Sequence, residues 1–152
     1  GTVINLANGT NTITLDIATY SGRIITTSDA TLVITLPTIS ASSDDTGDTA
    51  SSLGASFFIY VDTTAAAGPG WQLKTDGTDK FVGSILMVDT DTAGAGSGYA
   101  PAAANDCINF NGSTTGGIAG SWVRVTPIAA LKYFVEGIAL GSGAVATPFA
   151  DS

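Results

Sequence analysis

Hydrophobic and polar positions alternate with a period of two along much of the chain. Within residues 11–19, Ile13, Leu15 and Ile17 fall on one face of an extended backbone, with threonine and aspartate on the other. Three further stretches rich in Val, Ile, Thr and Leu have short turn-like sequences between them, and these are TVINL (2–6), GRIITT (22–27) and TLVITLP (31–37). All four are predicted to be β-strands.

The run ASFFIYVD (55–62) is apolar without interruption, so a central strand buried on both faces is predicted there. Further strands are predicted at 71–77, at 79–89, on both sides of the glycine-rich stretch NGSTTGGIAG, and at 130–141. Residues 38–54 and 90–105 contain little that a core could bury and are expected to be long loops.

No segment of ten or more residues combines helical periodicity with a cap and a glycine stop. About ten short strands with turn signals between them predict an all-β fold, an antiparallel sandwich or a barrel-like fold with long loops. We expect one domain over residues 1–152, with N-terminal strands in 1–37 and a C-terminal arm in 141–152.

Charged residues are few and one-sided, with thirteen acidic and five basic side chains and a net charge of −8. Twelve of the acids are aspartate, which favours turns and caps over helix interiors. The five bases are scattered singly, whereas a nucleic-acid binder needs clustered cations, so neither nucleic acid nor an anionic membrane surface is an expected partner.

The usual catalytic side chains are scarce, since there is no histidine, one cysteine (Cys107) and one glutamate (Glu136). Neither a Ser-His-Asp nor a Cys-His arrangement can be built, so an enzyme is not expected. The stretch NGSTTGGIAG leads into a strand and lacks the Lys–Ser/Thr pair of a phosphate-binding loop, so it is interpreted as a turn.

Asp89 and Asp91 in VDTDTAGAGSG are the nearest candidates for a calcium site. They lack the third ligand and the downstream glutamate of the known calcium loop, so no metal site and no cofactor are predicted. A sugar platform could be lined by Trp71, Trp122, Tyr20, Tyr60 and Tyr99, although the two tryptophans are interpreted as anchors of the core or of an interface.

Three stretches together resemble the head decoration, or cement, proteins of tailed bacteriophages. They are ITLP followed by a loop and GASFFIYVD, then TDGTDKFVGSI, then NDCINFNGSTTGGIAGSWVRVTP with the closing YFVEGIALGSGAVATPFADS. The resemblance covers roughly residues 30–152 and is most specific at Asp79-Lys80-Phe81-x-Gly83 and Thr147-Pro148-Phe149. It implies an all-β module on the outer capsid surface of the virion, often a homotrimer, that stabilises the shell by bridging major capsid protein subunits.

Two other classes remain open. One is a tail-fibre, adhesin-like or carbohydrate-binding β-domain, which would bind glycans in isolation. The other is a cell-surface structural β-module, which a cleaved leader in the reading frame would favour.

The C-terminal arm is predicted to be an interface segment, with Gly141–Gly143 as a joint and Val145, Pro148 and Phe149 as contact residues. The alternative is that Phe149 folds back onto its own sheet.

Overall fold

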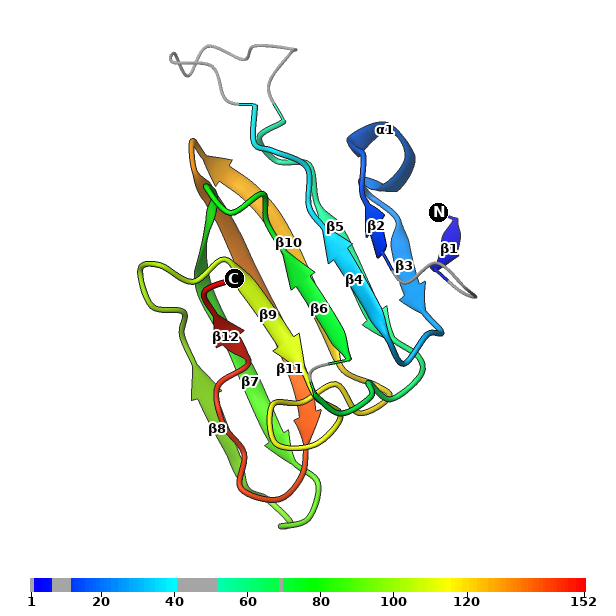
Figure 1. Ribbon diagram of the computed structural model, residues 1–152, viewed down its shortest axis with the longest axis vertical. Coiled ribbons are helices and arrows are strands. Elements are labelled where there is room, and N and C mark those ends of the chain that lie inside the picture. The colour runs from blue at the N-terminus through cyan, green and yellow to red at the C-terminus, as the bar shows by residue number, and fades with distance from the viewer. Residues whose placement is uncertain (1, 7–11, 41–51, 69) are drawn as a thin grey trace.

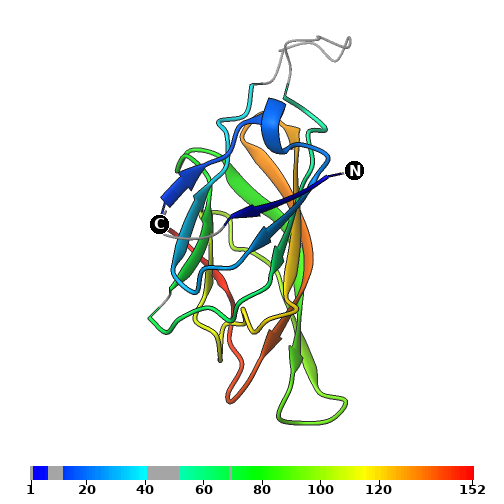
Figure 2. The ribbon, with the colours of Figure 1, turned by 90° about the vertical axis from the view of Figure 1, so that its right-hand side faces the viewer.

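Two β-sheets pack face to face in the computed structural model, which describes residues 2–6, 12–40, 52–68 and 70–152 (Figures 1 and 2). Within this part of the chain, the larger sheet has the order β1 (Val3–Leu6), β3 (Ile24–Thr27), β5 (Phe57–Val61), β10 (Trp122–Ala129), β11 (Lys132–Gly141), β7 (Lys80–Asp89) and β8 (Gly96–Tyr99). The smaller has the order β12 (Phe149–Ala150), β9 (Cys107–Phe110), β6 (Trp71–Lys74), β4 (Leu32–Thr35) and β2 (Thr12–Thr14). The prediction of an all-β sandwich is confirmed.

The core lies between the sheets because alternate side chains of each strand point inward. The seven-stranded sheet contributes residues such as Ile25, Ile59 and Val123, none of which has measurable exposure. Trp71 of the five-stranded sheet stacks on Phe110, with 4.8 Å between the ring centroids, and its indole N–H donates to the Thr27 hydroxyl across the core. Trp71 is therefore a core anchor, one of the two roles predicted for it.

The strand pairing is mixed, which differs from the antiparallel arrangement expected. From β1 to β6 the chain changes sheet at every strand, so the strands that become neighbours in one sheet are separated by a strand of the other. Strands reached by such a round trip run in the same direction, as β3 does beside β5 and β4 beside β6. Only after β6 do consecutive strands form hairpins, β7 with β8 and β10 with β11.

The strand predicted over residues 11–19 ends early, and its last part is a single helical turn, α1 (Ile17–Tyr20). Asp16 caps this turn by accepting a hydrogen bond of 2.8 Å from the amide of Thr19. A side-chain acceptor that binds a free amide at the start of a helix stabilises the helical turn. Here this stabilisation outweighs the preference for a strand that the short alternating pattern indicates. Among the described residues no longer helix occurs, in agreement with the lack of long helical periodicity in the sequence.

The two predicted loops have different outcomes. The loop at 90–105 contains β8, which pairs with β7 through Tyr99 and Ile85, so it is shorter than expected. No strand was predicted there, because the glycines at 96 and 98 have low β-propensity. Most of the loop at 38–54 lies outside the described residues.

The C-terminal segment is docked on its own chain, which corrects the prediction of an arm that leaves the domain. Strand β12 pairs with β9 through Phe149 and Ile108, and Phe149 is 6 % exposed beside Phe81, with 6.4 Å between the rings. Pro148 is buried, and its carbonyl accepts from the amide of Asn109. Val145 is half-buried against the core. The alternative in which Phe149 folds back onto its own sheet describes the structure.

Candidate functional site

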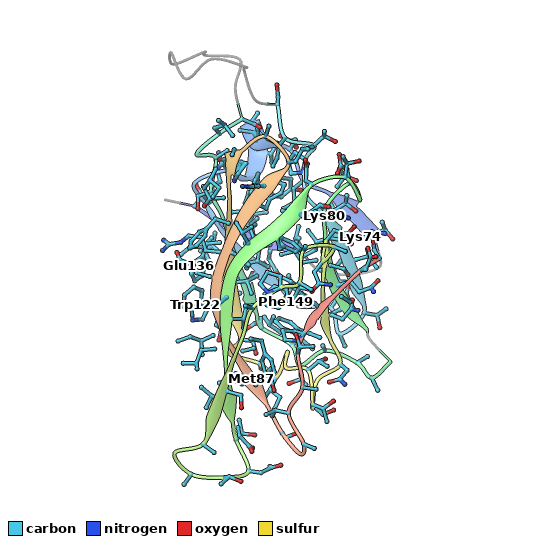
Figure 3. All side chains as sticks on the ribbon, turned by 90° about the vertical axis from the view of Figure 1, so that its left-hand side faces the viewer. Lys74, Lys80, Met87, Trp122, Glu136 and Phe149 are labelled. Carbon is cyan, nitrogen blue, oxygen red and sulfur yellow. The ribbon has the colours of Figure 1, made fainter. Side chains whose placement is uncertain are left out.

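An apolar surface without a partner in the structure is the solvent side of the seven-stranded sheet, here called the outer face. The strand registers align its side chains in two neighbouring rows. One row contains Ile24, Phe58, Arg124, Glu136 and Ser84. The next contains Thr26, Tyr60, Trp122, Ile138 and Leu86. Figure 3 shows Trp122 and Glu136 on one side of this sheet and Phe149 on the other.

Several apolar side chains of the outer face are open to solvent. Ile24 is 47 % exposed and Leu86 is 49 % exposed, while Ile138 and Phe134 each keep more than a third of their surface in water. Single exposed apolar residues are ordinary, but a contiguous group on adjacent strands is typical of a surface that binds another molecule. The outer face is therefore the candidate interaction site.

Aromatic residues occupy the middle of the outer face. Phe58 and Trp122 lie on neighbouring strands and stack, with ring centroids 5.3 Å apart and planes inclined by 18°. Tyr60 is the direct cross-strand partner of Trp122. Trp122 is only half-buried on the outer face, whereas Trp71 lies in the core.

Charge is almost absent from the two rows. Their ionisable side chains, apart from the phenol of Tyr60, are Arg124 and Glu136, which form an ion pair in which Arg124 Nε donates to Glu136 Oε1 at 2.6 Å. Both side chains are well exposed, so the pair adds little to stability. Its consequence is that the two rows carry no net charge, on a chain with a net charge of −8.

The glycine-rich stretch is a tightly packed turn. Asn111 Oδ1 accepts from the amides of Ser113 and Thr115, and Gly112 N–H donates to Gly116 O, which closes the turn on itself. Gly117 has φ +88°, and a Cβ there would overlap the Cβ of Phe110. Glycine is needed at position 117 because the backbone passes directly over the core there. The stretch forms a turn, in agreement with the interpretation of its sequence.

The calcium candidates Asp89 and Asp91 do lie in one turn. Asp89 Oδ1 accepts from the amide of Asp91, and Asp91 Oδ2 accepts from the amide of Gly143 at 2.7 Å. The Asp89 carboxylate therefore stabilises the β7–β8 turn itself, and the Asp91 carboxylate fastens that turn to the segment after β11. Among the described residues no group of three metal-ligating side chains comes together.

Cys107 is enclosed in the five-stranded sheet, and its thiol donates to Asn109 Oδ1 at 3.0 Å. Burial, helped by the nearby Asp106 carboxylate, raises the pKa of the Cys107 thiol to about 11. The thiol is therefore protonated at neutral pH and out of contact with solvent, as expected for an apolar filler.

A polar cluster fixes the C-terminus beside Phe149. Lys80 Nζ donates to Asp106 Oδ2 at 2.8 Å, and the amide of Ser152 donates to Asp106 Oδ1 at 2.8 Å. Burial opposes ionisation of Asp106, but these hydrogen bonds outweigh it and lower the pKa of the carboxyl. The sequence motif around Lys80 and the terminal motif around Phe149 thus meet in space.

Comparison of the chain with protein-family models, with curated proteins and with solved structures found no match in any of the three. In the described part of the chain, no helix has the length and apolar character needed to span a bilayer.

The sequence singled out Trp122 and Tyr60 but missed the rest of the outer face. Ile24, Phe58 and Leu86 each belong to predicted strands, yet which alternate set of side chains faces the core is decided by pairing that the sequence does not reveal. The outer face could have been predicted from the large apolar side chains that occur on both faces of the strands at 55–62 and 130–141.

Proposed function

We propose that the protein is a structural virion protein of a tailed bacteriophage, which decorates the outer capsid surface and stabilises it by bridging major capsid protein subunits. The observation that carries the proposal is the outer face, an apolar and aromatic sheet surface whose two aligned rows hold one ion pair as their charged groups. Such a surface suits a broad protein contact and carries no chemistry of its own. The sequence resemblance to decoration proteins supports the same role.

The proposal includes assembly as a homotrimer. Three copies on one capsid site engage several subunits at once, so weak individual contacts combine into stable attachment. Light scattering on the purified protein, over a range of concentrations, measures this directly. A mass of three chains is expected, and a single-chain mass at every concentration would count against the trimer.

The test of capsid attachment is a binding assay with expanded capsids of the phage whose genome encodes the chain. Leu86→Asp places a charge in the outer face, and we expect it to weaken binding by about tenfold or more, because a buried unpaired carboxylate opposes the contact. Leu131→Asp is the matched control, since Leu131 is 54 % exposed in the β10–β11 turn, close to the 49 % of Leu86.

Both variants should unfold at nearly the wild-type temperature, because the two leucines are half exposed. Equal capsid affinity for wild type and Leu86→Asp, with fold intact, would remove the outer face from the proposal. Failure of the wild-type protein to bind the capsids would overturn the proposed function itself.

The stacked pair Phe58 and Trp122 favours a second candidate, a carbohydrate-binding domain. Sugar rings pack their apolar faces on exposed aromatic side chains, and polar groups beside them supply hydrogen bonds, here from Arg124 and Glu136. A glycan array with the isolated protein discriminates the two functions. Specific glycan binding that is lost in Trp122→Ala would support this candidate, and the absence of any binding would dismiss it.

A further inference from the structure

A hollow of about 300 Å³ opens at one side of the outer face. It is lined by Gly22, Arg23, Ile24, Ser56, Phe58 and Arg124. Ile24 and Phe58 are cross-strand partners, as are Phe58 and Arg124, so the hollow spans β3, β5 and β10. Because Ile24, Phe58 and Arg124 also belong to the outer face, any protein seated on that face also covers the hollow.

The hollow concentrates positive charge on an acidic molecule. Two of the five basic residues, Arg23 and Arg124, line it, and Glu136 is the ion-pair partner of Arg124. Within the described residues, the Arg23 side chain makes no ion pair. Two guanidinium groups against one carboxylate leave a local charge of +1 where the chain as a whole carries −8.

The remaining lining completes a mixed polar and apolar environment. The Ser56 hydroxyl is engaged only by a long contact of 3.4 Å from the Thr126 hydroxyl in the described structure. Phe58 supplies an aromatic wall, and Gly22 leaves the entrance open, because nothing lies within 4 Å of the position that a side chain would take there.

We propose that this hollow is a carboxylate-binding site, which receives an aspartate or glutamate side chain of the protein that docks on the outer face. The planar guanidinium fork matches a carboxylate with two parallel hydrogen bonds. The volume suits one acidic side chain with a few waters, at roughly 30 Å³ for each water. This inference deepens the proposed function and takes from it that the partner is a protein.

The test is an NMR titration of the full-length protein with N-acetyl-glutamate N-methylamide. Amide shifts of Gly22, Arg23 and Ser56 are expected to move, with weak affinity. The matched N-acetyl-glutamine N-methylamide should leave them unchanged, because it is isosteric and uncharged. Inorganic phosphate and glucuronate are the other two probes, and each should bind at least about threefold more weakly than the glutamate compound.

Variants separate a built site from net charge. Arg23→Gln should weaken glutamate binding at least about fivefold, and Glu136→Gln should tighten it about threefold, since it frees Arg124 from its partner. Lys132→Gln is the control, because it removes the same charge from a residue that lines a different hollow. Equal weakening by Arg23→Gln and Lys132→Gln would overturn the proposal.

Other outcomes also decide it. Phosphate or glucuronate binding as tightly as the glutamate compound would overturn the assignment to an acidic protein side chain, and unchanged shifts with all probes would overturn the site.

The affinity of Arg23→Gln for capsids distinguishes failure of the carboxylate site from failure of the proposed function. Wild-type affinity of this variant for capsids would overturn the carboxylate contact and leave the decoration role standing. If the wild-type protein binds the glutamate compound but does not bind capsids, the carboxylate site stands and the decoration role is overturned.

Discussion

Replacing Phe149 with alanine tests whether the C-terminal segment belongs to the fold of its own chain. Phe149 is 6 % exposed and packs against Phe81. Burial of a phenylalanine side chain contributes about 1.5–3 kcal/mol, and the cavity left by truncation adds to the loss, so core Phe→Ala changes cost about 3–5 kcal/mol. Strand β12 has two residues at a sheet edge and can relax, which places the expected loss near the lower bound, about 3 kcal/mol.

Thermal unfolding and urea unfolding measure this loss. For a domain of this size each kcal/mol lowers the melting temperature by roughly 2–4 °C, so about 3 kcal/mol corresponds to roughly 6–12 °C. Phe134→Ala is the matched control, because Phe134 lies on the outer face and is 37 % exposed. Its expected cost is about 1 kcal/mol.

The concentration dependence of the shift distinguishes a docked strand from an exchanged one. If Phe149 packs on its own chain, the difference between variant and wild type is the same at every protein concentration. An arm that docks on a neighbouring copy gives a difference that changes with concentration, by mass action. Equal melting-temperature losses for Phe149→Ala and Phe134→Ala would refute the reasoning.

Two further predictions concern local packing and pH. Gly117→Ala should cost at least about 2 kcal/mol in urea unfolding, because its Cβ would overlap Phe110, whereas Gly94→Ala, with positive φ but open space, should cost about 1 kcal/mol. The lowered pKa of Asp106 means that its ionised form stabilises the fold above the ordinary aspartate pKa of about 3.9 and that this stabilisation is lost as pH falls through the folded-state pKa. The stability gap between wild type and Asp106→Asn, followed by thermal unfolding, should therefore be widest near neutral pH and shrink below about pH 4; a gap that stays constant with pH would contradict it.

Sequence patterns located most strands because period-two alternation, continuous apolar runs and turn residues are local properties. The strand around Ile59 and the two hairpin strands after residue 121 were found in this way. Pairing is not local, so the parallel neighbours β3 and β5 could not be foreseen from adjacency in the chain. The docking of Phe149 was also hidden, since a glycine joint followed by apolar residues fits both a free arm and a returning strand.

The candidate site shows the same division between local and long-range information. The sequence shows the apolar residues of the outer face, such as Phe58, Tyr60 and Trp122. Their placement side by side on one surface depends on the register between β5 and β10. The pairing of Arg124 with Glu136 depends likewise on the β10–β11 register. Sequence reasoning therefore found single aromatic residues and missed the apolar surface that they form together.

Strand β5 connects this surface to the proposed function. Its sequence, FFIYV, is apolar at every position, which is typical of a strand buried on both faces. In the described structure Phe57, Ile59 and Val61 are fully buried, while Phe58 and Tyr60 on the opposite side are only half-buried. The isolated chain thus buries one of the two faces of β5, although the sequence of this strand favours burial of both. A partner on the outer face would complete the other, and the strand would then have the environment that its composition predicts.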